Sequence, residues 1–140
     1  MPNASVSVDV LRECWIKLSG AGPSFAVASL LQARGGRVAD TEIGARVVEN
    51  IYEESAAVCS AEGYPPPEEM KNIILNNLWG QKGSNYGPSI LADIENNRKT
   101  EGEQVIGDLV QRARKHNLRT PLMEAALCKI QLYENNLIIK

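Results

Sequence analysis

Hydrophobic residues recur three and four positions apart along almost the whole chain, which is the pattern of helices that bury one face. In the N-terminal part, this spacing predicts one helix that ends at residues 20–23 and a second, mostly apolar helix over residues 24–33. Pro23 and its neighbouring glycines indicate a break between the two helices. Gly35-Gly36 indicates where the second helix stops.

The same spacing predicts two further helices before the middle of the chain. Asp40 or Thr41 can cap a long third helix. The glycine and three prolines of residues 63–67 end that helix. A fourth helix is predicted to begin near residues 68–69, where two glutamates favour a helix N-terminus, and to end before Gly80.

The C-terminal part predicts a short helix over residues 89–97, followed by two longer ones. Thr100 and Glu103 have the spacing of a capping box at the start of the first long helix. The basic turn at residues 112–116 suits its end. Pro121, which follows a threonine, suits the first turn of the last helix. The pattern therefore predicts an all-α fold of six or seven helices.

Composition agrees with one globular domain spanning residues 1–140. The formal net charge is −2, and only two tryptophans, four tyrosines and one phenylalanine are present. We therefore expect neither nucleic acid nor a membrane surface as a partner. The N-terminus lacks the pattern of a signal peptide, and no apolar run is long enough to span a membrane. A cytoplasmic location is expected.

Cysteine and histidine offer little chemistry. Cys14, Cys59 and Cys128 are widely spaced within predicted helices, where we interpret them as small hydrophobic side chains. His116 is the only histidine, which excludes a two-histidine metal site, and no metal is expected. Its basic neighbours predict a solvated helix end, with a phosphate- or carboxylate-binding patch as the alternative.

Gly20-Ala21-Gly22 matches the start of a dinucleotide fingerprint, but the third glycine is absent and a helix precedes it instead of a strand. We therefore expect no nucleotide site at this position. Lys17 is interpreted either as a lysine that reaches solvent from an apolar face or as a desolvated proton donor. Ser89 is interpreted first as a helix N-cap, and Glu101 suits the first turn of a helix. Periodicity alone does not join these three residues into a site.

Two segments resemble the C-terminal domain of ketopantoate reductases (2-dehydropantoate 2-reductases), a helical domain of the phosphogluconate dehydrogenase C-terminal type. The similarity is specific over residues 88–124 and extends, more loosely, over about residues 8–134. The matching positions are Trp15, Lys17 and Leu18 near the N-terminus, and Ser89, Asp93, Thr100 and Glu101 in the second segment.

The resemblance implies a role for each matched residue. Lys17 matches the lysine that protonates the substrate ketone, and Glu101 matches the carboxylate that holds the substrate hydroxyl. Ser89 matches a serine that binds the substrate carboxylate. A lysine, a carboxylate and a hydroxyl that converge on a keto acid would polarise and orient it. The further candidates for substrate binding are Asp93, Phe25 and Tyr86.

Two departures from the family pattern change this expectation. Ala21 and Phe25 replace the two asparagines with which the reductases grip their substrate. Together with Trp79 and Tyr86, they predict a substrate that is larger and less polar than ketopantoate, such as an intermediate of secondary metabolism. The family's N-terminal Rossmann domain also has no counterpart in these residues, so no cofactor is expected on this chain alone.

Three functions are compatible with these features. The first is a cofactor-independent isomerase, lyase or cyclase, in which Lys17 and Glu101 act as acid and base on a carbonyl-bearing small molecule. The second is the substrate-binding subunit of a split NADPH-dependent 2-keto acid reductase, with its cofactor domain on a separate protein. The third is a non-catalytic binding or regulatory domain. In each case the face that a Rossmann domain would cover predicts a homodimer with twofold symmetry.

Overall fold

The computed structural model describes the backbone of residues 2–139 and the side chains of residues 10–137. All regular structure within these residues is helical, which confirms the all-α prediction. The elements are α1 (Pro2–Leu31), α2 (Gly35–Ala39), α3 (Gly44–Ala61), α4 (Met70–Asn72), the π-helical segment η1 (Ile73–Leu78), α5 (Ser89–Glu95), α6 (Gly102–Lys115) and α7 (Pro121–Ile139).

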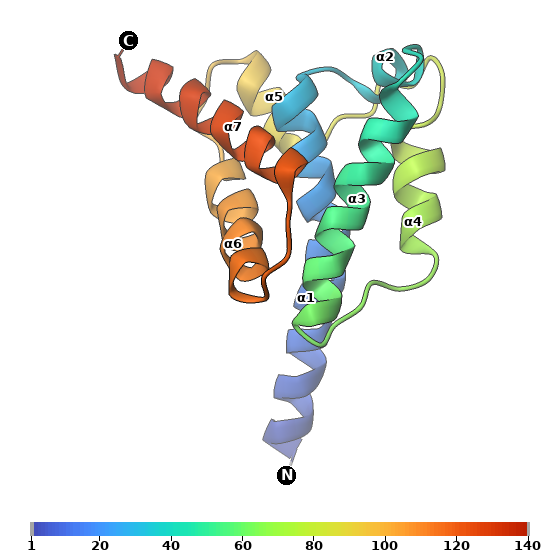
Figure 1. Ribbon diagram of the computed structural model, residues 1–140, viewed down its shortest axis with the longest axis vertical. Coiled ribbons are helices and arrows are strands. Elements are labelled where there is room, and N and C mark those ends of the chain that lie inside the picture. Colours follow the sequence, from blue (N-terminus) through green and yellow to red (C-terminus); the bar gives the residue numbers. More distant parts are fainter. Residues whose placement is uncertain (1, 140) are drawn as a thin grey trace.

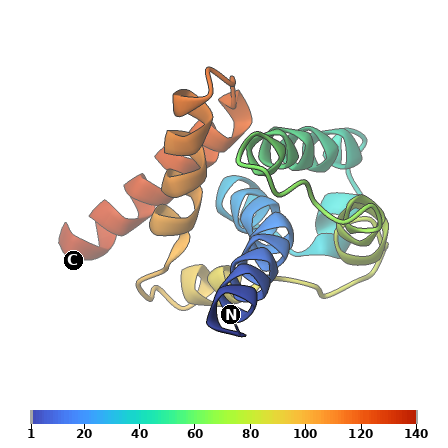
Figure 2. The ribbon, with the colours of Figure 1, turned by 90° about the horizontal axis from the view of Figure 1, so that it is seen from below.

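Helix α1 is the centre of the fold, because α3, α5, α6 and α7 all pack against it. It lies behind α3 and α7 in Figure 1, and its N-terminal part projects below the other helices. Seen from below, α3 and α5 lie on opposite sides of α1 (Figure 2). Ala26, Val27 and Ala28 of α1 are fully buried and belong to the hydrophobic core. The second half of α1 is thus enclosed, whereas residues 10–14, 16 and 17 of its first half are exposed.

The predicted break at residues 20–23 is wrong, because α1 runs through Pro23 without interruption. A proline inside a helix costs about 3 kcal/mol, which the packing of both halves of α1 against their neighbours offsets. The glycine before it has a packing role. A Cβ atom on Gly22 would lie 2.7 Å from Cδ1 of Leu109, so glycine lets α6 approach α1 closely.

The glycine pair predicted as a helix stop begins the short helix α2 instead, after α1 has ended at Leu31. The backbone N–H groups of Gly35 and Gly36 donate to the carbonyls of Tyr86 and Ser84, at 2.8 and 2.9 Å. A Cβ atom on Gly36 would lie 2.5 Å from the Ser84 carbonyl oxygen. These glycines therefore let the segment before α5 pack directly on α2.

The remaining helices agree with the periodicity, but their first residues differ from the predicted ones. Helix α3 begins at Gly44 with Ile43 as its N-cap, and the Thr41 hydroxyl donates to the Val38 carbonyl of α2 (2.7 Å). Neither predicted cap is used, since Asp40 is instead the C-cap of α2 and the Thr41 hydroxyl bonds back to that helix. Helix α7 begins at Pro121 as predicted, and the carboxylate of Glu54 accepts hydrogen bonds from two N–H groups of its first turn.

Candidate functional site

The three residues that the resemblance singles out lie on three helices. Lys17 is on α1, Ser89 is the first residue of α5, and Glu101 is the N-cap of α6. All three side chains are exposed, and none forms a hydrogen bond or ion pair within the described residues. Five cavities at the surface of these residues are lined by other side chains. The structure thus presents three accessible groups with no polar contact between them.

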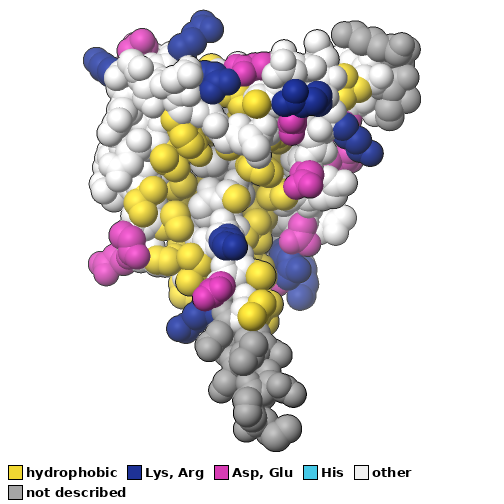
Figure 3. Space-filling model, turned by 180° about the vertical axis from the view of Figure 1, so that it is seen from behind, with side chains coloured by type: hydrophobic (Ala, Val, Ile, Leu, Met, Phe, Trp, Pro, Cys, Tyr) yellow, Lys and Arg dark blue, Asp and Glu magenta, His cyan; other side chains and the backbone are white. Residues whose placement is uncertain are grey.

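Lys17 lies in an apolar face of α1. A helix turns by about 100° per residue, so Val10, Cys14, Lys17 and Ala21 share one side of it, which we call the Lys17 face. The first three are exposed, Val10 by 53 %, and Ala21 is half-buried. Hydrophobic side chains gather along the middle of the rear of the molecule (Figure 3). The Lys17 side chain is therefore exposed to water on the same side of α1 as the exposed side chains of Val10 and Cys14.

Aromatic side chains close one end of the Lys17 face. Ser24, two turns beyond Lys17, is buried, and its Oγ accepts hydrogen bonds from the Trp79 indole (3.2 Å) and the Tyr86 hydroxyl (3.4 Å). The two rings meet edge to face, with centroids 5.2 Å apart. Trp79 is only 1 % exposed, so it belongs to the core rather than to a surface that a substrate can touch. Phe25 and Tyr86 are half-buried.

Glu101 lies in a turn that α7 holds in place. The carboxylate of Glu134 accepts hydrogen bonds from the backbone N–H (2.9 Å) and the hydroxyl (2.6 Å) of Thr100, and Thr100 Oγ1 accepts one from the Gly102 N–H (3.2 Å). The predicted capping box is wrong, because Glu103 bonds to a side chain of α7 instead. A carboxylate 34 residues away takes its place. The backbone on both sides of Glu101 is fixed while its side chain stays accessible.

Ser89 and Asp93 are on successive turns of α5. Ser89 is not the N-cap, because Pro88 takes that position in an extended conformation and α5 has no side-chain cap. The Asp93 carboxylate accepts a hydrogen bond from Nε of Arg98 (3.2 Å), and its carbonyl accepts one from the Tyr133 hydroxyl (3.1 Å). Asp93 thus ties α5 to α7, whereas the hydroxyl of Ser89 has no partner within the described residues.

A second polar cluster lies where α3 and α6 end, and only its basic side could be predicted from the sequence. The Glu62 carboxylate bonds to both Arg112 and His116, and its side chain is only 9 % exposed. The Arg112 guanidinium lies 5.1 Å from the centre of the Trp15 ring, whose other neighbour is Tyr64, stacked at 5.4 Å. The prediction of a solvated His116 is therefore wrong. The basic turn was visible in the sequence, but its acidic partner is distant along the chain.

Stability should fall in acid through Glu62. Hydrogen bonds from His116 and Arg112 hold the pKa of this carboxyl below its usual value. A depressed pKa favours the folded state above the unfolded pKa, and this contribution is lost as pH falls through the folded pKa. We expect Glu62→Gln to lower the free energy of unfolding at pH 7 and to matter less near pH 3. Urea denaturation at both pH values measures this, and a pH-independent difference would contradict it.

Other chemistry is sparse in the described part of the chain. Burial raises the pKa of the Cys59 thiol to about 11, while Cys14 and Cys128 are exposed and free. No group of three potential metal ligands occurs among these residues, and none of their helices could cross a membrane. Residues 20–22 lie inside α1, so they lack the strand and turn of a dinucleotide fingerprint and do not fit a nicotinamide cofactor.

Comparison with known proteins shows which family this chain resembles. Residues 9–134 match the family model described as "Ketopantoate reductase PanE/ApbA C terminal". The chain is 28 % identical over 121 residues to 2-dehydropantoate 2-reductase of Yersinia pestis, and 24 % identical over 129 residues to YkpB, an uncharacterized oxidoreductase of Bacillus subtilis. These alignments cover 86 % and 92 % of the chain.

Among solved structures, a dimeric ketopantoate reductase from Staphylococcus aureus superposes with a TM-score of 0.78 at 21 % identity, over 91 % of the chain. The chain spans only 39 % of the Yersinia protein, 42 % of the Bacillus protein and 44 % of the Staphylococcus protein. The family model that matches describes a C-terminal part. The chain therefore belongs to the family of ketopantoate reductase C-terminal domains.

Proposed function

We propose that this chain is the substrate-binding half of a nicotinamide-dependent 2-keto acid reductase, and that the Lys17 face receives the nucleotide-binding part. The observation that carries this proposal is an exposed lysine within an uncovered apolar face of the central helix. A large apolar patch on a soluble protein is typical of an interaction site. A substrate bound at this face would be shielded from water only after the nucleotide-binding part covered it.

Exposed hydrophobic side chains on α1 support a missing partner. Val10, Leu11 and Ile16 are exposed by 53, 48 and 38 %. Large apolar side chains left in contact with water on one helix are typical of a surface that another domain or protein covers.

The three accessible groups suit the binding of a 2-keto acid. In this proposal the Lys17 ammonium binds the ketone oxygen and supplies its proton, and the Ser89 hydroxyl binds the carboxylate. Glu101 accepts a hydrogen bond from a substrate hydroxyl, and its fixed backbone lowers the entropy lost on binding. The hydride donor belongs to the other part in this proposal, because residues 20–22 lie inside α1 and do not form a dinucleotide-binding turn.

The surroundings of Lys17 favour an apolar substrate side chain. Ala21 follows Lys17 by one turn on the same side of α1, and Phe25 and Tyr86 are the half-buried aromatics at the end of that face. None of these groups except the Tyr86 hydroxyl can hydrogen-bond to a polar substituent, and that hydroxyl already donates to Ser24. A 2-keto acid with a bulky apolar substituent fits this surface better than ketopantoate does.

The hypothesis that this chain is a cofactor-independent isomerase, lyase or cyclase is less well supported. Acid–base chemistry by one chain would need its groups gathered in a site that excludes water. Lys17 and Glu101 are instead both solvent-accessible and make no contact with each other. The arrangement supports half of a composite site better than a complete one. The dimeric state of the Staphylococcus relative extends the proposal to a homodimer.

A chimera tests the proposal. This chain replaces the C-terminal half of the Yersinia pestis reductase, and the purified, folded chimera is assayed with NADPH or NADH and a panel of 2-keto acids. We expect turnover, with higher kcat/KM for apolar substrates than for ketopantoate. Calorimetry on the unfused chain should show no binding of either nucleotide. A folded chimera without turnover, or tight nucleotide binding by the chain alone, would overturn the proposal.

A further inference from the structure

A cavity of about 230 Å³ opens to solvent between the first half of α1 and the loop that follows α3. Its walls are aromatic: the rings of Trp15 and Tyr64 lie nearly parallel, with their centroids 5.4 Å apart, and Pro65 and Pro67 complete the lining. We call it the Trp15 cavity. None of the other four surface cavities of the described residues has an aromatic residue in its wall. Aromatic walls favour a flat, apolar ligand.

The loop that forms one wall of the Trp15 cavity is fixed by the end of α3. Gly63 adopts a φ of 94°, which favours glycine, and its N–H donates to the Ser60 carbonyl (3.0 Å). The Tyr64 N–H donates to the Cys59 carbonyl (2.9 Å), and the two bonds together form a Schellman motif. The prolines restrict the backbone beyond Tyr64. The wall is therefore ordered before a ligand arrives, so little conformational entropy is lost on binding.

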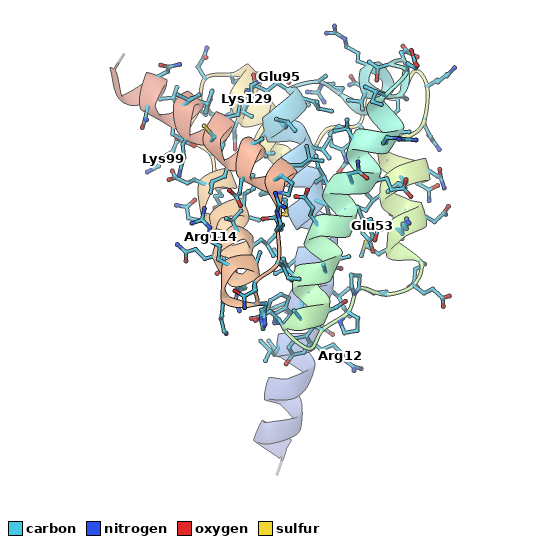
Figure 4. The ribbon with its side chains drawn as sticks, in the orientation of Figure 1. Arg12, Glu53, Glu95, Lys99, Arg114 and Lys129 are labelled. Atoms are coloured by element: carbon cyan, nitrogen blue, oxygen red, sulfur yellow. The ribbon has the colours of Figure 1, made fainter. Side chains whose placement is uncertain are left out.

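Arg12 places an uncompensated positive charge at this cavity. Its side chain is exposed and forms no ion pair within the described residues, and none of the residues that line the cavity is acidic. Figure 4 shows Arg12 on α1, next to the end of α3 and the loop that follows. Arg112, which lies over the Trp15 ring, is instead neutralised by Glu62 and Asp108. The free guanidinium of Arg12 thus favours a ligand that carries an acidic group.

We propose that the Trp15 cavity binds a small aromatic carboxylate, with its ring against the Trp15–Tyr64 pair and its carboxylate paired with Arg12. The cavity is smaller than the roughly 300 Å³ at which pockets for drug-sized ligands begin, so it suits one ring with a short acidic side chain. A helix turns by about 100° per residue, which puts Arg12, Trp15 and Ile16 on the side of α1 opposite the Lys17 face. The cavity is therefore separate from the proposed substrate site and does not depend on the reductase function.

A titration of the chain with phenylacetate, followed by NMR of its N–H groups, tests the proposal. Each tryptophan indole gives its own signal, and Trp15→Phe assigns the two. We expect the Trp15 signal to shift with a dissociation constant of about 0.1 to 1 mM, as for a ligand of this size. The signal of Trp79, which is 1 % exposed, should stay in place. The absence of a saturable shift up to about 10 mM would overturn the proposal.

Three further probes separate the parts of the ligand. Cyclohexylacetate has the charge without the aromatic ring, benzyl alcohol has the ring without the charge, and inorganic phosphate has the charge alone. Each should bind at least about threefold more weakly than phenylacetate, because each loses one of the two contacts. Equal affinity for cyclohexylacetate or phosphate would contradict stacking on the aromatic walls, and equal affinity for benzyl alcohol would contradict pairing with Arg12.

Arg12→Gln should weaken the binding of phenylacetate at least about tenfold, because it removes the charge that pairs with the carboxylate. Arg37→Gln is the matched control, since Arg37 is also exposed and lines a cavity, but one with aliphatic walls. This variant and Lys17→Ala should leave the dissociation constant within about twofold of the wild type, because salt screens charges outside the cavity. Circular dichroism confirms that the variants are folded. An unchanged dissociation constant for Arg12→Gln, or an equal loss of affinity for Lys17→Ala, would overturn the assignment of the ligand to this cavity.

Discussion

Replacing Lys17 with alanine should lower kcat of the chimeric reductase by about 10²- to 10⁴-fold, the usual contribution of a positioned proton donor. The thermal midpoint of the unfused chain should hardly change, because the side chain is exposed and has no partner within the described residues. This combination separates a catalytic residue from a structural one. A large loss of activity together with a large loss of stability would point to a packing role instead.

The matched control is Lys82→Ala, which removes another exposed lysine from the loop before α5. It should change neither kcat nor the thermal midpoint.

Glu101→Gln should raise KM more than it lowers kcat, because the proposed carboxylate only orients the substrate. Full activity of Lys17→Ala in a folded chimera would show that the family role does not carry over to this residue.

The helices could be predicted from the sequence because their stability depends on an apolar face with a regular period. The breaks between helices could not be predicted in this way. Glycine and proline favour a break locally, but contacts with distant helices, which the sequence does not show, can outweigh this preference. Gly22 and Pro23 are breakers by local rules, yet α1 runs through them since Leu109 of α6 needs the space above Gly22. Gly36 likewise permits contact with a loop almost fifty residues further on.

Polar contacts were the least predictable part of the site. Thr100 looked like half of a local capping box, but its partner is Glu134 on another helix. His116 looked solvated, but Glu62 at the end of α3 pairs with it. Both partners come from distant segments, and nothing in their local sequence identifies them. The positions of Lys17 and Glu101 on exposed surfaces are equally invisible to periodicity, because they depend on which faces the other helices leave open.

Trp79 belongs to the hydrophobic core and also borders the candidate site. Removing its side chain should give the largest loss in the free energy of unfolding. The side chain is almost fully buried, and its indole N–H bonds to Ser24 of the central helix. The backbone N–H of Trp79 also closes the π-helical segment by bonding to the Ile74 carbonyl at 3.1 Å. Trp79→Ala leaves an enclosed cavity and should lower the free energy of unfolding by about 3 to 5 kcal/mol.

Trp15→Ala provides the matched control. Trp15 lines a cavity that opens to solvent, so truncating it leaves no enclosed void and should cost clearly less than Trp79→Ala. Urea denaturation followed by circular dichroism gives both values. Since Tyr86 rests edge-on against Trp79, the loss of this ring should also loosen the closed end of the Lys17 face and raise KM in the chimera. Equal costs for the two tryptophans would mean that Trp79 does not anchor the core beneath that face.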